Sequence, residues 1–79
     1  MRIKISARAQ GTTPAEAVVT IPTMRGPEAV VVFASQASTE SVEAGFIGER
    51  DDQILVELPC GALSARWRVW IPRDAVAAP

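Results

Sequence analysis

The chain has 79 residues, enough for one domain, with 8 basic and 9 acidic side chains and a formal net charge of −1. This balance excludes a strong overall field for nucleic acid or an anionic membrane, and no apolar run approaches the roughly 20 residues of a membrane span. Hydrophobic residues make up 48% of the chain. We expect a single cytoplasmic domain over residues 1–79, because the N-terminus lacks a signal-peptide pattern.

The first predicted strand covers residues 2–9, where apolar and polar side chains alternate without a break. Successive side chains of a strand point to opposite faces. Ile3, Ile5 and Ala7 are therefore expected to face the core.

Three further strands are predicted between turn signals. Residues 17–21 form a β-branched run ended by proline, although the preceding Thr-Pro-Ala-Glu also matches the start of a short helix. Residues 28–35 hold four strong β-formers in a row, which predicts a central strand buried on both faces, with a partly helical segment as the alternative. Residues 42–47 alternate again, and Gly45 and Gly48 predict a bulge or a strong bend.

The clearest pattern is a hairpin of residues 54–59 and 66–72 around a loop at 60–65. Each strand has one wholly apolar face, and these faces are expected to pair and to turn to the core; their residues are Ile54, Val56, Leu58, Trp67, Val69 and Ile71. About six short strands predict an all-β fold, a small antiparallel barrel or sandwich. Residues 73–79 are expected to form one turn and a frayed tail.

The opposite face of the hairpin carries Glu57, Arg66, Arg68 and Trp70. One interpretation is structural, with arginine stacked on the indole or paired with the carboxylate. The other is a contact patch, because Trp and Arg are enriched at interface hot spots. Cys60 is the lone cysteine and lies in the predicted loop. It is expected to be an inert turn residue, with an intermolecular disulfide as the alternative.

Catalysis is not expected from these residues. The chain has no histidine, which excludes Ser-His-Asp and Cys-His arrangements and His-ligated metal sites. Glu49, Asp51 and Asp52 form a carboxylate cluster that lacks the spacing of a calcium loop. We therefore expect no enzyme activity, no metal and no cofactor.

Charge is unevenly distributed along the chain. Residues 26–57 hold seven acidic side chains and one basic, whereas residues 1–25 hold four basic and one acidic. An acidic patch would suit a basic partner surface; the alternative is that the segments mix in space. The partner-binding residues predicted from the sequence are Glu49, Asp51, Asp52, Glu57, Arg66, Arg68 and Trp70.

The stretch Trp67-Arg-Val-Trp-Ile-Pro-Arg-Asp-Ala-Val76 resembles the end of SH3-like barrels, where a strand with an aromatic residue and a proline leads into a short turn. The resemblance implies a small β-barrel. It leaves open a nucleic-acid-binding or regulatory interaction module, in which the arginines would act with Trp70 as a stacking platform. The low isoelectric point, about 5.3, argues against nucleic acid.

In overall character the chain resembles small inhibitors carried by phages and prophages, above all the type I anti-CRISPR proteins. The shared features are small size, an Ala/Val/Arg-rich composition, an acidic middle section and the lack of catalytic residues. The resemblance implies stoichiometric binding to a Cas subunit or surveillance complex, which blocks DNA recognition. The expected function is therefore a non-enzymatic, protein-binding inhibitor, a monomer or weak homodimer that does not bind nucleic acid or membrane itself.

Overall fold

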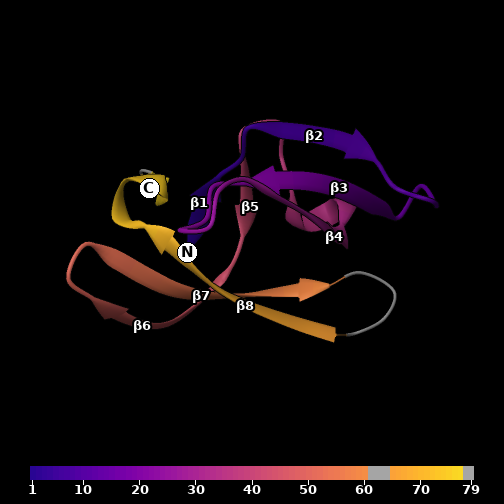
Figure 1. Cartoon of the computed structure of the whole chain (residues 1–79). Coiled ribbons are helices and arrows are strands. Elements are labelled where there is room, and N and C mark those ends of the chain that lie inside the picture. Colours follow the sequence, from indigo (N-terminus) through magenta and orange to yellow (C-terminus); the bar gives the residue numbers. More distant parts are fainter. Residues whose placement is uncertain (61–64, 78–79) are drawn as a thin grey trace.

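Three small antiparallel sheets form the fold (Figure 1). The computed structural model describes the backbone of residues 1–60 and 65–77 and the side chains of residues 1–58 and 67–77. The sheets are β1 (Arg2–Lys4) with β5 (Ser41–Glu43); β2 (Ala7–Gln10), β3 (Glu16–Ile21) and β4 (Glu28–Phe33); and β6 (Gly45–Arg50), β7 (Gln53–Cys60) and β8 (Ala65–Pro72). Two 3₁₀ helices, η1 (Ala34–Gln36) and η3 (Arg73–Ala75), follow β4 and β8. The prediction of an all-β fold is confirmed.

The strand predicted over residues 2–9 is divided into β1 and β2, which belong to different sheets. β1 pairs with β5, and after the bend the Ser6 N–H donates to the Thr20 carbonyl oxygen at 2.9 Å, where pairing with β3 begins. Ile3 is fully buried as predicted, but Ala7 is exposed. The inward prediction for Ala7 is wrong because β2 is the end strand of its sheet and all four of its residues are exposed.

β3 and β4 are strands, as predicted, but the prediction that residues 28–35 are buried on both faces is wrong. Val30 and Val32 are buried, whereas Val31 and Phe33 are exposed at 42% and 38%. β4 is the last strand of an antiparallel sheet, and such sheets commonly leave one face to solvent. A run of β-formers indicates a strand without showing how many of its faces are covered.

The bulge predicted from the two glycines is present in β6. The pairing of β6 with β7 shifts by one residue between Phe46 and Gly48, so Ile47 is an extra residue on β6. An extra residue moves every later side chain of its strand to the opposite face of the sheet. This change of face decides which β6 side chains reach the candidate site.

The β7–β8 hairpin pairs its two apolar faces as predicted, with Ile54 opposite Ile71, Val56 opposite Val69 and Leu58 opposite Trp67. The β7 members and Ile71 are buried. Trp67 and Val69 are half-buried and pack at the margin of the core, because β8 is the last strand of its sheet. The strands stay paired through residues 60 and 65, so the connecting loop is shorter than predicted.

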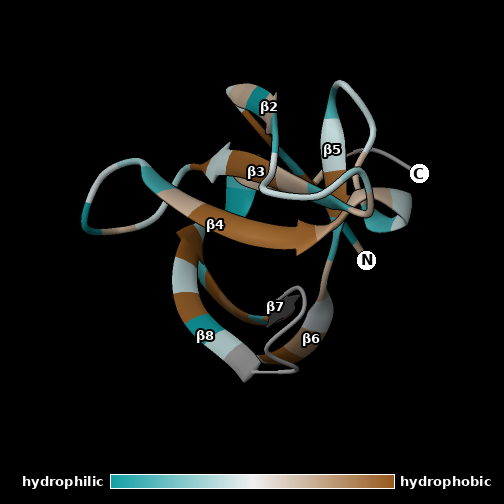
Figure 2. Ribbon diagram, turned by 90° about the vertical axis from the view of Figure 1, so that its right-hand side faces the viewer, coloured by the Kyte–Doolittle hydropathy of each residue, from teal (hydrophilic) through white to brown (hydrophobic). Residues whose placement is uncertain are grey.

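One hydrophobic core lies between the sheets (Figure 2), where the apolar face of β4 lies across from β7 and β8. Its fully buried large side chains come from all three sheets; they are Ile3, Val19, Ile21, Val32, Val42, Val56, Leu58 and Ile71. Ile5 packs against this core and is half-buried. Among the described residues, no helix is long and apolar enough to cross a membrane.

The segment after β8 forms one short turn, η3, as expected, and then packs on β1 through residue 77. η3 buries Ala75, Val76 forms a β-bridge with Ile3, and the Ala77 N–H donates to the Arg2 carbonyl oxygen at 2.9 Å. The Ala-Val-Ala sequence is too short to predict a strand, yet its apolar side chains gain by leaving water against the core. Residues 78–79 lie outside the described part of the chain.

Candidate functional site

The partner-binding residues predicted from the sequence lie in two groups on the β6–β7–β8 sheet. Glu49, Asp51 and Asp52 lie at the β6–β7 turn, and Glu57, Arg68 and Trp70 lie along β7 and β8. The backbone of Arg66 pairs with Pro59, but the side chains of Arg66 and Cys60 lie outside the described residues. The proposed roles of these two side chains therefore stay predictions.

The acidic β6–β7 turn is tied to Arg73, a residue that the sequence analysis did not single out. Arg73 Nη1 lies 2.9 Å from Glu49 Oε2, and Nη2 donates to the Asp51 carbonyl oxygen at 2.8 Å. The Arg73 backbone N–H donates to the Asp52 carbonyl oxygen at 2.9 Å. The turn is thus held against the end of β8, and the negative charge of Glu49 is balanced within the chain.

A second carboxylate of the acidic segment, Glu43, is paired at a distance from this turn. Glu43 Oε2 lies 3.3 Å from the Met1 ammonium nitrogen, which also donates to the Ala44 carbonyl oxygen at 2.9 Å. The hydrogen bond from this ammonium group lowers the pKa of Glu43 below its ordinary value. Glu43 therefore belongs to the junction of β1 with β5 and not to the predicted acidic patch.

Glu57 and Arg68 form the cross-strand pair that the sequence suggested. They lie directly opposite each other on β7 and β8, with Arg68 Nε 2.8 Å from Glu57 Oε2. The Glu57 side chain is 16% exposed and that of Arg68 63% exposed. The carboxylate thus holds the stem of Arg68 in place while most of the arginine remains open to solvent.

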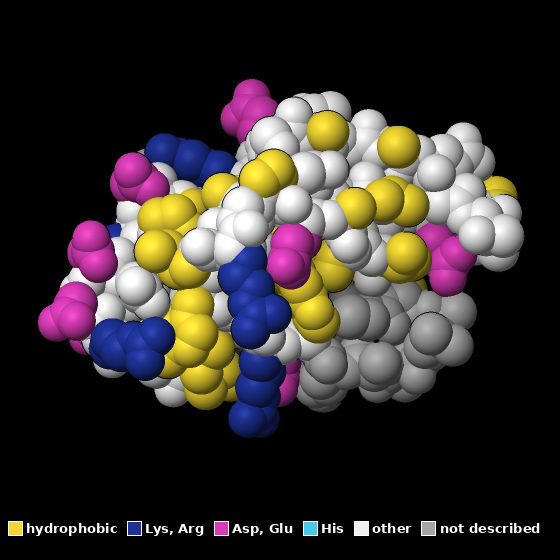
Figure 3. All heavy atoms as spheres, viewed as in Figure 1, with side chains coloured by type: hydrophobic (Ala, Val, Ile, Leu, Met, Phe, Trp, Pro, Cys, Tyr) yellow, Lys and Arg dark blue, Asp and Glu magenta, His cyan; other side chains and the backbone are white. Residues whose placement is uncertain are grey.

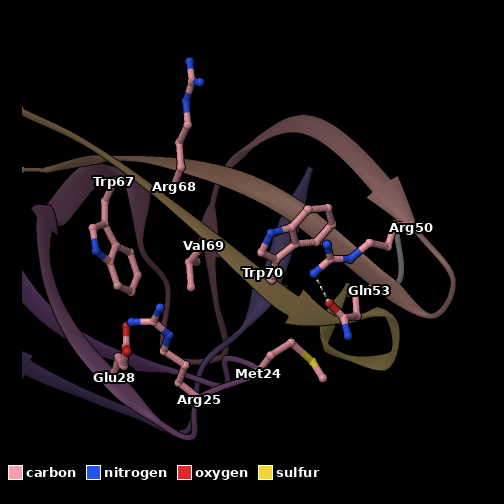
Figure 4. A pocket seen from close by; sticks show the side chains of 9 residues that line it. All are labelled: Met24, Arg25, Glu28, Arg50, Gln53, Trp67, Arg68, Val69 and Trp70. Carbon is pink, nitrogen blue, oxygen red and sulfur yellow. Dashed lines mark hydrogen bonds between the residues drawn. The ribbon is translucent and has the colours of Figure 1, made fainter.

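The cation that stacks on Trp70 is Arg50. Its Cζ lies 4.3 Å from the centroid of the Trp70 ring, and its Nη2 donates to Gln53 Oε1 at 3.3 Å (Figure 4). The sequence interpretation assigned this stacking to Arg66 and Arg68. Arg68 instead pairs with a carboxylate, so in the described part of the chain the indole is stacked by β6, two strands away.

A groove of about 640 Å³ brings these residues together, and we call it the β8 groove. Its lining residues are Met24, Arg25, Glu28, Arg50, Gln53, Trp67, Arg68, Val69 and Trp70. On this side of the molecule, basic side chains stand beside a strip of hydrophobic ones over the β6–β7–β8 sheet (Figure 3). Three arginines and one glutamate line the groove, so its lining is basic although the whole chain is not.

The β8 groove runs along the edge of β8. Four consecutive residues, 67–70, line it, and consecutive strand residues point to opposite faces. In Figure 4, Trp67 and Val69 point to one side of the strand and Arg68 to the other. Side chains from both faces can line one groove when it follows the strand's edge, and β8 is the last strand of its sheet.

The opposite wall of the groove is the turn between β3 and β4. The Thr23 Oγ1 donates to the Gly26 carbonyl oxygen at 2.6 Å and accepts from the Arg25 N–H at 3.1 Å. The Met24 N–H donates to the Trp70 carbonyl oxygen at 3.0 Å. This bond joins the turn to β8 and places Arg25 beside the groove.

Comparisons with protein-family models, curated proteins and solved structures found no match to this chain. Among the described residues, no group of three or more His, Cys, Asp or Glu side chains is placed to hold a metal ion. The function is therefore inferred from the geometry of the β8 groove.

Proposed function

We propose that this chain is a non-enzymatic protein-binding module whose contact surface is the β8 groove. The observation that carries the proposal is that Trp67, Trp70, Arg50 and Arg68 all line one groove along the edge of β8. Trp and Arg are the residue types most enriched at interface hot spots. Both indoles are half-buried, so they are already oriented, and a partner gains aromatic contact area at a small cost in side-chain entropy.

The charged and the aromatic residues of the groove are expected to control different rate constants of binding. The Arg68 guanidinium is mostly exposed, and exposed charges at a rim mainly change the association rate and its salt dependence. A desolvated aromatic anchor instead sets the dissociation rate. Trp70→Ala is therefore expected to speed dissociation of the partner. Arg68→Glu is expected to slow the association of an acidic partner with the groove.

The more specific form of this proposal is a stoichiometric inhibitor of a bacterial defence complex, acting on a Cas subunit or surveillance complex from the cytoplasm. Its support is the size and composition of the chain and the resemblance in character to type I anti-CRISPR proteins. A purified type I surveillance complex, incubated with an excess of the protein, is expected to lose binding to its target DNA. Unchanged DNA binding would reject this form and leave the binding module in place.

Retention of partners from a host lysate tests the module itself. Immobilised wild-type protein is compared with Trp70→Ala and Arg68→Glu, and with Arg8→Glu as a matched control on β2, outside the groove lining. We expect wild type and Arg8→Glu to retain a partner protein from a lysate that has been treated with nuclease. Both groove variants should fail to retain it. Equal retention by all four proteins would contradict the assignment of the groove.

The finer architecture that we propose is a small, partly open barrel of SH3-like type. Two features support it. β1 runs on into β2 and β5 into β6, so the chain links the three sheets in the order β4-β3-β2-β1-β5-β6-β7-β8. The stretch that resembles SH3-like barrels forms β8 and η3, and its Val76 then bridges to Ile3 on β1. Backbone nuclear Overhauser effects between β1 and residue 76, together with none between Val31 and β8, are expected for this arrangement.

Single-stranded nucleic acid is the second candidate partner, and the groove supplies an observation in its favour. Aromatic side chains flanked by arginines along a groove are the elements of single-strand binding, and the groove holds two tryptophans and three arginines. Titration of tryptophan fluorescence with an oligo-dT strand tests it. Tight binding that weakens steeply with salt would favour nucleic acid, whereas we expect no binding at physiological salt.

A further inference from the structure

The edge of β8 that faces the groove carries main-chain groups turned away from β7. Residues of an antiparallel pair alternate between those that bond to the neighbouring strand and those that point outward. The Trp70 carbonyl oxygen accepts the Met24 N–H, so Trp70 points outward, and Arg68, two residues earlier, points the same way. In the described part of the chain, Met24 is the residue that bonds to this edge, and its bond lies at Trp70.

The two sides of this edge differ in chemistry. Trp67 and Val69 present apolar surface on the side that turns toward the core, where Arg25 and Glu28 also stand. On the other side stand Arg68 and the stacked pair of Arg50 with Trp70. A strand laid along the edge would therefore meet apolar side chains at every second residue and guanidinium groups at the residues between them.

We propose that the β8 groove takes an extended partner segment in which acidic and apolar residues alternate, added as a strand to the edge of β8. The inference rests on the proposed function and names the chemistry of its partner. Main-chain bonds to Arg68 would supply affinity that does not depend on sequence, and the alternating side chains would supply specificity. The groove has three arginines against one glutamate, Glu28, and Glu57 pairs with Arg68 from beside it. The positive charge that remains favours acidic residues in the partner.

The Met24–Trp70 bond shows that this edge accepts a main-chain donor in the folded chain. It occupies the position that one residue of an added strand would take, and it marks where the added strand must end. An unprotected edge is a hazard that proteins commonly cover or charge. Arg68 places a positive charge at this edge, which would repel a basic strand and attract an acidic one.

Short capped peptides test the inference directly. The first probe is a peptide of eight residues in which glutamate alternates with valine, titrated into the isotope-labelled protein and followed by nuclear magnetic resonance. Two control peptides have the same length. One has the same composition with all glutamates placed before the valines, and the other has lysine in place of every glutamate. We expect the alternating acidic peptide to shift the backbone resonances of Arg68 and Trp70, and the two controls to leave them in place.

Methylation of the peptide backbone separates strand addition from simple charge attraction. One version is methylated at the valine nitrogens and the other at the glutamate nitrogens, and in an added strand one of these sets faces β8. We expect the two versions to differ in affinity by about tenfold or more. Amide exchange gives a second readout, because the Arg68 N–H should exchange faster than the Val69 N–H in the free protein and slow down when the peptide binds.

Variants connect the binding to the named side chains. Arg68→Glu is expected to weaken the binding of the alternating peptide by about five- to tenfold, whereas Arg8→Glu should leave its affinity unchanged.

Equal binding of both methylated peptides, or no protection of the Arg68 N–H, would overturn strand addition, as would oligo-dT binding in the groove. If the peptides fail while a host protein is still retained through Trp70 and Arg68, the inference falls and the proposed function stands. If the peptides bind but Trp70→Ala and Arg68→Glu retain the host protein as well as wild type does, the proposed function falls instead.

Discussion

Replacement of Gly26 by alanine is expected to destabilise the fold through the backbone alone. Gly26 has a φ of +104°, a conformation that residues with a Cβ rarely adopt, and a Cβ at this position would have no atom within 4 Å. The cost is therefore conformational strain without a steric clash. Two backbone bonds hold the strained conformation in place: Gly26 N–H to the Thr23 carbonyl oxygen at 3.0 Å, and the Thr23 N–H to the Gly26 carbonyl oxygen at 3.2 Å.

The expected magnitude follows from two opposing contributions. A residue held in a sparsely populated backbone region costs about 1–3 kcal/mol. Alanine also reduces the conformational entropy of the unfolded chain, which stabilises the folded state by about 0.4–1 kcal/mol. The net loss for Gly26→Ala is about 1–2 kcal/mol, and for a domain of this size it lowers the melting temperature by roughly 5–15 °C.

Gly48→Ala is the matched control for this prediction. Gly48 also has open space around its Cβ position, but it lies in β6 and its φ is outside the left-handed region. Only the unfolded-state contribution then applies, and stability should be unchanged or higher by about 0.5 kcal/mol. Thermal and urea unfolding of both variants, followed by circular dichroism, measure the difference. Melting temperatures within about 1 °C of each other would refute the strain at Gly26.

Three other predictions concern the core, the ion pair of Glu43 and the stacked arginine. Val32→Ala should lower the free energy of unfolding by about 2 kcal/mol and Val31→Ala by less than about 0.5 kcal/mol, because the first side chain is fully buried and the second 42% exposed; urea unfolding measures both. The lowered pKa of Glu43 adds stability that is present above its unfolded pKa and is lost as pH falls through its folded pKa. The stability difference between wild type and Glu43→Gln should therefore shrink as the pH falls below the ordinary glutamate value of 4.5, and a difference independent of pH would contradict it. Arg50→Ala should remove about 0.5 kcal/mol of stability and change tryptophan emission, and in a Trp70→Leu background the same substitution should leave the stability unchanged.

The alternation of apolar residues was enough to predict the β7–β8 hairpin. Ile54, Val56 and Leu58 lie opposite the other apolar face, as expected, because a shift of one residue would turn one of the two faces to solvent. The same alternation did not show which strands end a sheet. That is why Val31 and Phe33 were expected to be buried and are exposed.

The partner of Trp70 was not predicted because it depends on the β6 bulge. Before the bulge Gly45 lies opposite Glu57, and without the extra residue Glu49 would lie opposite Gln53. The one-residue shift places Arg50 there instead, on the face that carries Trp70. The glycines indicated a bulge, but its position determines whether a carboxylate or a guanidinium meets the indole.

The charge of the groove could not be read from the charge of sequence segments. Residues 1–25, 26–57 and 58–79 each contribute one arginine, namely Arg25, Arg50 and Arg68. Arg50 comes from the most acidic segment. Three carboxylates of that segment, those of Glu43, Glu49 and Glu57, form ion pairs with other parts of the chain. The basic character of the groove comes from Arg50 on β6 and Arg68 on β8, because the β3–β4 segment contributes Arg25 and Glu28 together. That segment supplies the wall that the Met24–Trp70 bond holds against β8. A change that moves the turn should therefore alter binding even if every arginine is kept.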